Sequence, residues 1–118
     1  MTTASDITAE LFDRYAAALL ARDEAGIAAL FAVPSLILFP GQGVAVSEAQ
    51  QTKDFFAASW AQYEGVDAID KTVTVTKEGP GTVWAHVVWS YGSAREHFCY
   101  QLVQRRHGWQ VAVLTPLS

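Results

Sequence analysis

The chain has 118 residues, which is enough for one domain and too few for two. Hydrophobic residues make up 51% of it and aromatic residues 12%, so the composition excludes an intrinsically disordered protein. The net charge of −4 and the scattered Lys and Arg residues argue against nucleic-acid binding, because neutralising phosphates needs a basic face. The one cysteine, Cys99, excludes an intrachain disulfide.

Neither a targeting segment nor a membrane span is recognisable in the sequence. The opening residues MTTASD lack the basic and apolar regions of a signal peptide. No apolar run approaches the ~20 residues that cross a bilayer. We therefore expect a cytoplasmic protein that does not bind membranes.

Two helices are predicted in the first third of the chain. Apolar and small residues recur at helical spacing from Ile7 onward, and Ser5 or Asp6 is the expected N-cap of a helix that runs to about Arg22. A second helix is expected to start near Asp23. It should end before Pro34, because the residue ahead of a proline avoids helical geometry.

A short hairpin, a third helix and a series of strands follow. The hairpin is predicted over residues 36–39 and 44–46, around a Pro-Gly-Gln-Gly turn. Ser47 is the expected N-cap of the third helix, with Gln50 completing a capping box and Gly65 near its end. The remaining sequence predicts strands at 71–77, 82–91, 94–106 and 109–117. This order predicts an α+β domain, with three N-terminal helices packed on a strongly curved antiparallel sheet.

The segment from Arg14 to Ala32, RYAAALLARDEAGIAALFA, places a tyrosine inside an apolar stripe. Arg14-Tyr15 and the pattern AALxxxDxxGIxALFA that follows from Ala17 resemble the opening of the nuclear transport factor 2-like (NTF2-like) superfamily. Within it, the pattern is similar to the ketosteroid isomerase and SnoaL-like branches. The order of elements agrees with that superfamily over nearly the whole chain. The resemblance implies a single domain over residues 1–118, shaped as a cone with a helix lid over its pocket.

Turn lengths predict which strand residues share a face. A two-residue turn at Gly92-Ser93 sets Trp89 opposite Glu96 and Val87 opposite Phe98, and cross-strand partners lie on the same face. A three-residue loop would reverse every assignment. The more apolar face then holds Ala85, Val87, Trp89, Tyr91, Glu96, Phe98, Tyr100 and Leu102. A two-residue turn at His107-Gly108 would add Val113 and Thr115 to it.

We expect this face to line the pocket together with Tyr15, Phe31, Phe39, Phe55 and Trp60. The residues predicted to contact a ligand are Phe39, Phe55, Trp60, Val87, Trp89 and Phe98. The opposite face carries Trp84, His86, Val88, Cys99 and Val103. Apolar surface of this size is typical of an interface, so we expect a homodimer through it, as the superfamily commonly forms. The alternative is a solvent-facing tryptophan that the fold tolerates.

Candidate catalytic residues follow from the resemblance. Tyr15 falls on the tyrosine with which ketosteroid isomerases stabilise a developing oxyanion, and Tyr100 falls at or beside their second donor. The alternative for Tyr15 is a core tyrosine whose hydroxyl has another partner. The isomerase's base, an aspartate before a proline, corresponds here to Phe39, which cannot move a proton. Glu96 is a candidate substitute base, or else a solvated carboxylate at the rim.

No metal or cofactor is expected. His86, His97 and Cys99 share a face, but neighbours on a flat strand pair meet tetrahedral zinc geometry poorly, so interface packing is favoured. Two functions stay open at this point. One is a SnoaL-like protein that binds a hydrophobic carbonyl compound and isomerises or cyclises it. The other is a non-catalytic dimerisation module in which aromatic side chains fill the cone.

Overall fold

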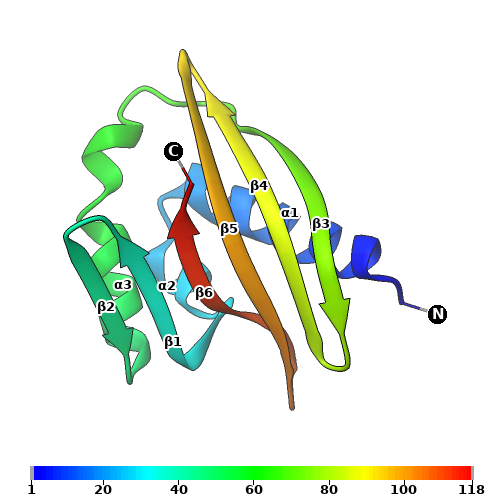
Figure 1. Ribbon diagram of the computed structural model, residues 1–118. Helices are drawn as coiled ribbons and strands as arrows, with labels where there is room; N and C mark the ends of the chain where they lie inside the picture. The colour runs from blue at the N-terminus through cyan, green and yellow to red at the C-terminus, as the bar shows by residue number, and fades with distance from the viewer. Residues whose placement is uncertain (1, 118) are drawn as a thin grey trace.

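A curved six-stranded sheet forms one layer of the protein, and helices cover its concave face (Figure 1). The computed structural model describes residues 2–117. The helices are α1 (Ala4–Ala21), α2 (Glu24–Ala28), α3 (Ala49–Ala57) and the 3-10 helix η1 (Trp60–Tyr63). The strands are β1 (Phe31–Phe39), β2 (Gln42–Val46), β3 (Asp70–Gly79), β4 (Thr82–Tyr91), β5 (Ala94–Arg105) and β6 (Gly108–Pro116). The predicted α+β class is thereby confirmed.

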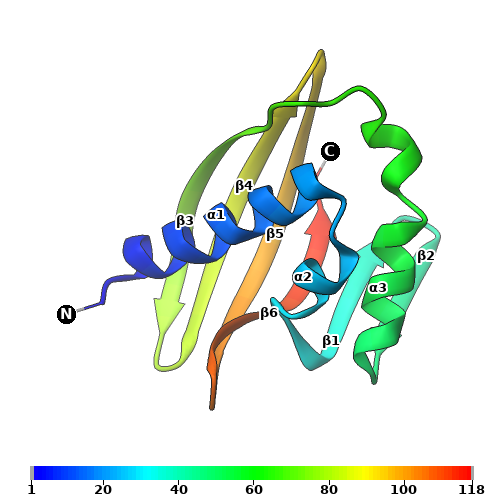
Figure 2. The same ribbon diagram turned by 180° about the vertical axis from the view of Figure 1, so that it is seen from behind.

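The strand order across the sheet is β2-β1-β6-β5-β4-β3. All neighbours are antiparallel except β1 and β6, which run parallel, so the sheet is mostly rather than wholly antiparallel. Register shifts interrupt the β1–β6, β3–β4 and β5–β6 ladders. Such irregularities bend strands and increase their twist, which accounts for the concave surface. Figure 2 shows α1 crossing that surface over β3 to β5, while α3 lies beside β1 and β2.

The helices begin close to the predicted positions, with corrected caps. Thr3, rather than Ser5 or Asp6, caps α1, because its hydroxyl accepts from the Asp6 amide at 3.1 Å and the Asp6 carboxylate accepts from the Thr3 amide at 3.2 Å. The capping box of α3 is shifted by one residue. Its Gln51 side chain, rather than that of Gln50, accepts from the amide of Glu48 at 3.0 Å. Within residues 2–117 no helix is both long and apolar enough to cross a membrane.

The second helix is shorter than predicted. Asp23 caps it as expected, accepting from the Gly26 amide at 2.9 Å, but it ends at Ala28 and β1 has begun by Phe31. Strand pairing starts early because the Leu30 carbonyl accepts from the Val111 amide of β6 at 2.7 Å. Pro34 lies inside β1, where the β1–β6 register shifts. A proline fits there because its missing N–H breaks no regular ladder bond.

The β4–β5 register agrees with the prediction from Trp89 opposite Glu96 to Val83 opposite Leu102. The register of β6 was predicted wrongly. Arg105 pairs with Gly108, so the turn is Arg106-His107, one residue earlier than expected, and a bulge follows between Gln101 and Leu102. Val113 and Thr115 therefore lie on the convex face, and Leu114 takes the concave position opposite Tyr100.

Candidate ligand-binding cavity

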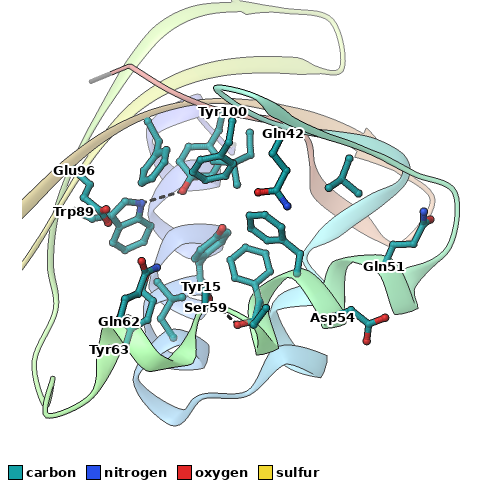
Figure 3. A pocket seen from close by; sticks show the side chains of 18 residues that line it. Tyr15, Gln42, Gln51, Asp54, Ser59, Gln62, Tyr63, Trp89, Glu96 and Tyr100 are labelled. Carbon is teal, nitrogen blue, oxygen red and sulfur yellow. Dashed lines mark hydrogen bonds between the residues drawn. The ribbon is translucent and has the colours of Figure 1, made fainter.

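A cavity of about 680 Å³ lies between the concave face of the sheet and the α3–η1 segment (Figure 3). Its walls come from α1, the β1–β2 hairpin, α3, η1 and the three strands β4 to β6. The lining residues are Tyr15, Leu19, Phe39, Gln42, Val44, Gln51, Asp54, Phe55, Phe56, Ala58, Ser59, Gln62, Tyr63, Trp89, Glu96, Phe98, Tyr100 and Leu114. The cone is therefore not filled by its own aromatic side chains.

The floor of the cavity is made of buried aromatic rings. Tyr15 reaches it from α1 with only 2% of its surface exposed, and its hydroxyl points into the hollow (Figure 3). Its ring packs against Trp89 at a centroid distance of 5.4 Å and against Tyr100 at 5.8 Å. Tyr15 sits in the floor because α1 places it on the same face as Leu11, Phe12 and Leu19, all of them buried.

One hydrogen bond fixes the two rings beside Tyr15. The indole Nε1 of Trp89 donates to the hydroxyl oxygen of Tyr100 at 2.9 Å, in a buried site. An indole N–H can only donate, so Tyr100 must be the acceptor and its own proton stays available to another group. Phe12 closes this arrangement from below, with its ring 4.9 Å from that of Tyr100. The two phenols thus face the same hollow as neutral donors.

The ionisation of these phenols is suppressed. Burial, followed by the adjacent Tyr100, raises the pKa of Tyr15 well above its ordinary value. Burial also raises the pKa of Tyr100, although the hydrogen bond from the indole of Trp89 opposes that effect. Both hydroxyls keep their protons at neutral pH. They can therefore donate to a carbonyl or to a developing negative charge.

Glu96 lies on β5 opposite Trp89, its cross-strand partner. The hydroxyl of Tyr91 donates to its Oε1 at 2.7 Å. Burial, and then this bond to a carboxylate, raises the pKa of Tyr91. The ring of Tyr63 stacks near Tyr91 at 5.0 Å and itself lines the cavity. Glu96 is half-buried and held by a phenol, which differs from the freely solvated rim carboxylate considered from sequence.

A polar rim that the sequence reasoning missed surrounds the entrance. Gln42, Asp54 and Gln62 are exposed there, and Gln51 and Ser59 are half-buried. Three amide side chains can orient a polar part of a ligand near water. One signal could have found this rim, namely that Gln51, Phe55, Ala58 and Gln62 follow helical spacing and place the amides beside a predicted pocket residue.

Arg22 is a second residue that the sequence reasoning missed. It ends α1 in the left-handed conformation with φ 53°, and its guanidinium donates to the carbonyls of Leu20 at 2.8 Å and Val66 at 3.0 Å. It also donates to the carbonyl of Tyr63. These bonds tie the end of α1 to the η1 segment, which forms one wall of the cavity.

Seven of the predicted pocket residues line the cavity: Tyr15, Tyr100, Glu96, Phe39, Phe55, Trp89 and Phe98. Two predicted ligand contacts lie elsewhere. Val87 is fully buried in the core, and Trp60 packs outside the cavity against Phe56 and Tyr63. Phe31, expected in the lining, is core as well. The concave face of β4 and β5 was predicted correctly. Val87 lies on that face but does not line the cavity, which does not extend as far along β4 as residue 87.

The residues predicted to form a dimer interface lie on the convex face of the sheet. His86 pairs with Cys99 in register, and its Nε2 lies 3.1 Å from Nδ1 of His97. Among residues 2–117, no group of three or more His, Cys, Asp or Glu side chains is arranged to hold a metal ion. Partial burial raises the pKa of the Cys99 thiol, which opposes formation of a reactive thiolate.

The fold and the cavity define a class of protein, the cone-shaped α+β domains with a hollow between sheet and helices. A family described as NTF2-like protein (DUF6841) matches residues 5–118, and the chain belongs to that family. A comparison with curated proteins finds no match.

Solved structures agree in fold. A domain of unknown function with a cystatin-like fold from Nostoc punctiforme has a TM-score of 0.75 and 17% identity, over 98% of this chain and 78% of that one. An NTF2-like protein from Cytophaga hutchinsonii has a TM-score of 0.75 and 12% identity, over 98% of both chains. A candidate aromatic ring hydroxylase from Novosphingobium aromaticivorans has a TM-score of 0.70 and 15% identity, over 93% of this chain and 85% of that one. Identities this low establish the fold alone.

Proposed function

We propose that the protein binds a flat hydrophobic compound with a carbonyl group in its cavity, in the manner of SnoaL-like proteins. The observation that carries the proposal is a hollow of about 680 Å³ into which the hydroxyl of Tyr15 points. This volume suits a small organic ligand, and an apolar lining with a few convergent polar groups is typical of such sites. The hydroxyls of Tyr15 and Tyr100 donate to the carbonyl oxygen of the ligand.

If the bound compound reacts, the reaction is isomerisation or cyclisation through an enolate. Two neutral phenols stabilise negative charge on the carbonyl oxygen, because donors aimed at developing charge in a dry site cost no reorganisation. Phe39 occupies the place of the isomerase base, so the known isomerase route does not apply. Glu96 is the substitute base of the proposal, since it is one of two carboxylates in the lining and Tyr91 orients it. The protein acts in the cytoplasm.

A thermal-shift panel of steroids, polyketides and aromatic ketones tests the proposal. A ligand that binds only the native state raises the melting temperature by mass action. Tyr15→Phe should weaken binding of each hit by about fivefold, the equivalent of roughly 1 kcal/mol for one hydrogen bond. Thr76→Val, which removes a hydroxyl that donates to the Trp84 carbonyl outside the cavity lining, serves as the matched control. A panel without hits, or hits that bind Tyr15→Phe unchanged, would refute the proposal.

The second candidate function is a dimerisation module without catalysis. The convex face favours it, because Leu36 and Leu38 of β1 are 42% and 39% exposed, and Trp84, Val88 and Val103 of β4 and β5 are half-buried. Exposed apolar surface can mark interaction sites. The absent isomerase base favours it too. A dimer could also bind a ligand. This second function is therefore supported only if the protein forms a stable dimer and binds none of the compounds in the panel.

A further inference from the structure

The charge of the cavity restricts the ligand further than its shape does. Among the residues that the structure describes, Asp54 and Glu96 are the lining residues that carry charge at neutral pH, and none is Lys, Arg or His. The nearby guanidinium of Arg22 donates to backbone carbonyls and does not line the hollow. An anionic ligand would therefore approach two carboxylates without a cation to offset them. Such like-charge contacts oppose binding.

The Glu96 carboxylate can accept further hydrogen bonds. Tyr91 donates to Oε1, and no hydrogen bond or ion pair to Oε2 occurs within residues 2–117, where the one salt bridge joins Lys71 to Asp13. A carboxylate has room for several donors. Trp89 is the direct cross-strand partner of Glu96, and Figure 3 shows the indole beside the carboxylate. A carboxylate next to an aromatic face is an environment that binds a cationic nitrogen.

We propose that the ligand of this cavity carries a basic nitrogen, which Glu96 and the indole of Trp89 bind as an ammonium while the apolar body reaches the phenols of Tyr15 and Tyr100. This inference rests on the proposed function, because it needs an occupied cavity. It adds the charge of the ligand, and it makes Glu96 the group that binds this charge in place of the base of the enolate reaction. Anionic analogues of the same shape are rejected.

Three probes of one shape test the inference: 2-naphthylmethylamine, 2-naphthalenemethanol and 2-naphthoate. Their dissociation constants are measured by calorimetry at neutral pH, where the amine is protonated and the acid ionised. We expect the ammonium to bind at least about fivefold more tightly than the alcohol, the factor that corresponds to ~1 kcal/mol for a partly exposed ion pair. The naphthoate should bind more weakly than the alcohol.

Three variants assign the effect. Glu96→Gln keeps shape and should abolish the preference for the ammonium over the alcohol, and a thermal transition as cooperative as that of the wild type shows that the variant folds. Glu78→Gln removes one negative charge at an exposed position near the end of β3, outside the cavity, so the preference should survive. Asp54→Asn removes the other lining carboxylate and should reduce the preference less than Glu96→Gln does.

Each contrary result has its own meaning. Equal affinity for the three probes, or tighter binding of the naphthoate, would overturn the inference and leave the proposed function standing, because the cavity would still be occupied. A preference for the ammonium that persists in Glu96→Gln or disappears in Asp54→Asn would overturn the role of Glu96. Failure of all three probes to bind would overturn the inference, whereas the proposed function is tested separately by the thermal-shift panel of carbonyl compounds.

Discussion

At the scale of single residues, Tyr15 and Tyr100 both line the floor of the cavity, but their hydroxyls have different hydrogen-bonding roles. The hydroxyl of Tyr100 is the acceptor for the buried indole of Trp89, whereas that of Tyr15 points into the hollow. Tyr100→Phe leaves an indole N–H without its partner, which should lower the free energy of unfolding by about 1–3 kcal/mol. Tyr15→Phe should lower it less. Urea denaturation of the two variants measures the difference, and equal losses would contradict these assigned roles.

The buried phenols also predict a dependence of stability on pH. Their pKa values are raised in the folded protein, so the native state keeps protons that the unfolded chain releases above its ordinary tyrosine pKa of about 10. Their contribution to stability is complete below that pH and is lost as the pH rises through the raised values. The free energy of unfolding should therefore fall above about pH 10, and Tyr15→Phe should reduce the slope. A parallel slope in the variant would count against a buried, protonated Tyr15.

At the scale of elements, Arg22 joins the end of α1 to the wall of the cavity. Arg22→Ala removes its bonds to the carbonyls of Tyr63 and Val66 and should speed hydrogen exchange in the η1 segment. Arg22→Gly removes the same bonds but relieves the left-handed backbone, which costs non-glycine residues roughly 1 kcal/mol. Arg22→Gly should thus be the more stable of the two. The reverse order would show that the backbone at position 22 is not strained.

The elements also show how far sequence reasoning reaches. The concave face of β4 and β5 could be predicted, because the Gly92-Ser93 turn fixes the register and alternation then assigns every side chain. The face of β6 beyond Val111 could not, because a bulge between Gln101 and Leu102 shifts the ladder by one residue and exchanges its faces. The polar rim was missed for another reason. Gln42, Gln51 and Gln62 gather only through the packing of α3 and η1 against the β1–β2 hairpin, which periodicity does not report.

At the scale of the whole molecule, we predict a homodimer that pairs the convex faces. Val88→Glu would place a charge at the half-buried centre of that face and should convert the dimer to a monomer, as measured by sedimentation velocity. Ala9→Glu, on an exposed position of α1, is the matched control and should remain dimeric. A wild-type protein that sediments as a monomer would refute the interface.

The cavity and the convex face lie on opposite sides of the sheet, so ligand binding and dimerisation are separable. Val88→Glu should bind the aromatic ketones as tightly as the wild type does, because none of the lining residues lies on the convex face. Calorimetry on the monomeric variant measures this. A loss of binding would show instead that the partner copy completes the site.

The most direct measurement is a crystal structure of the protein soaked with a neutral aromatic ketone that raises its melting temperature. We predict density for the ketone between β5 and η1, with its carbonyl oxygen within about 2.7–3.0 Å of the hydroxyl of Tyr15. A hollow closed by the rings of Phe39, Phe55 and Phe98, with the Tyr15 hydroxyl bonded to a protein atom, would contradict the account.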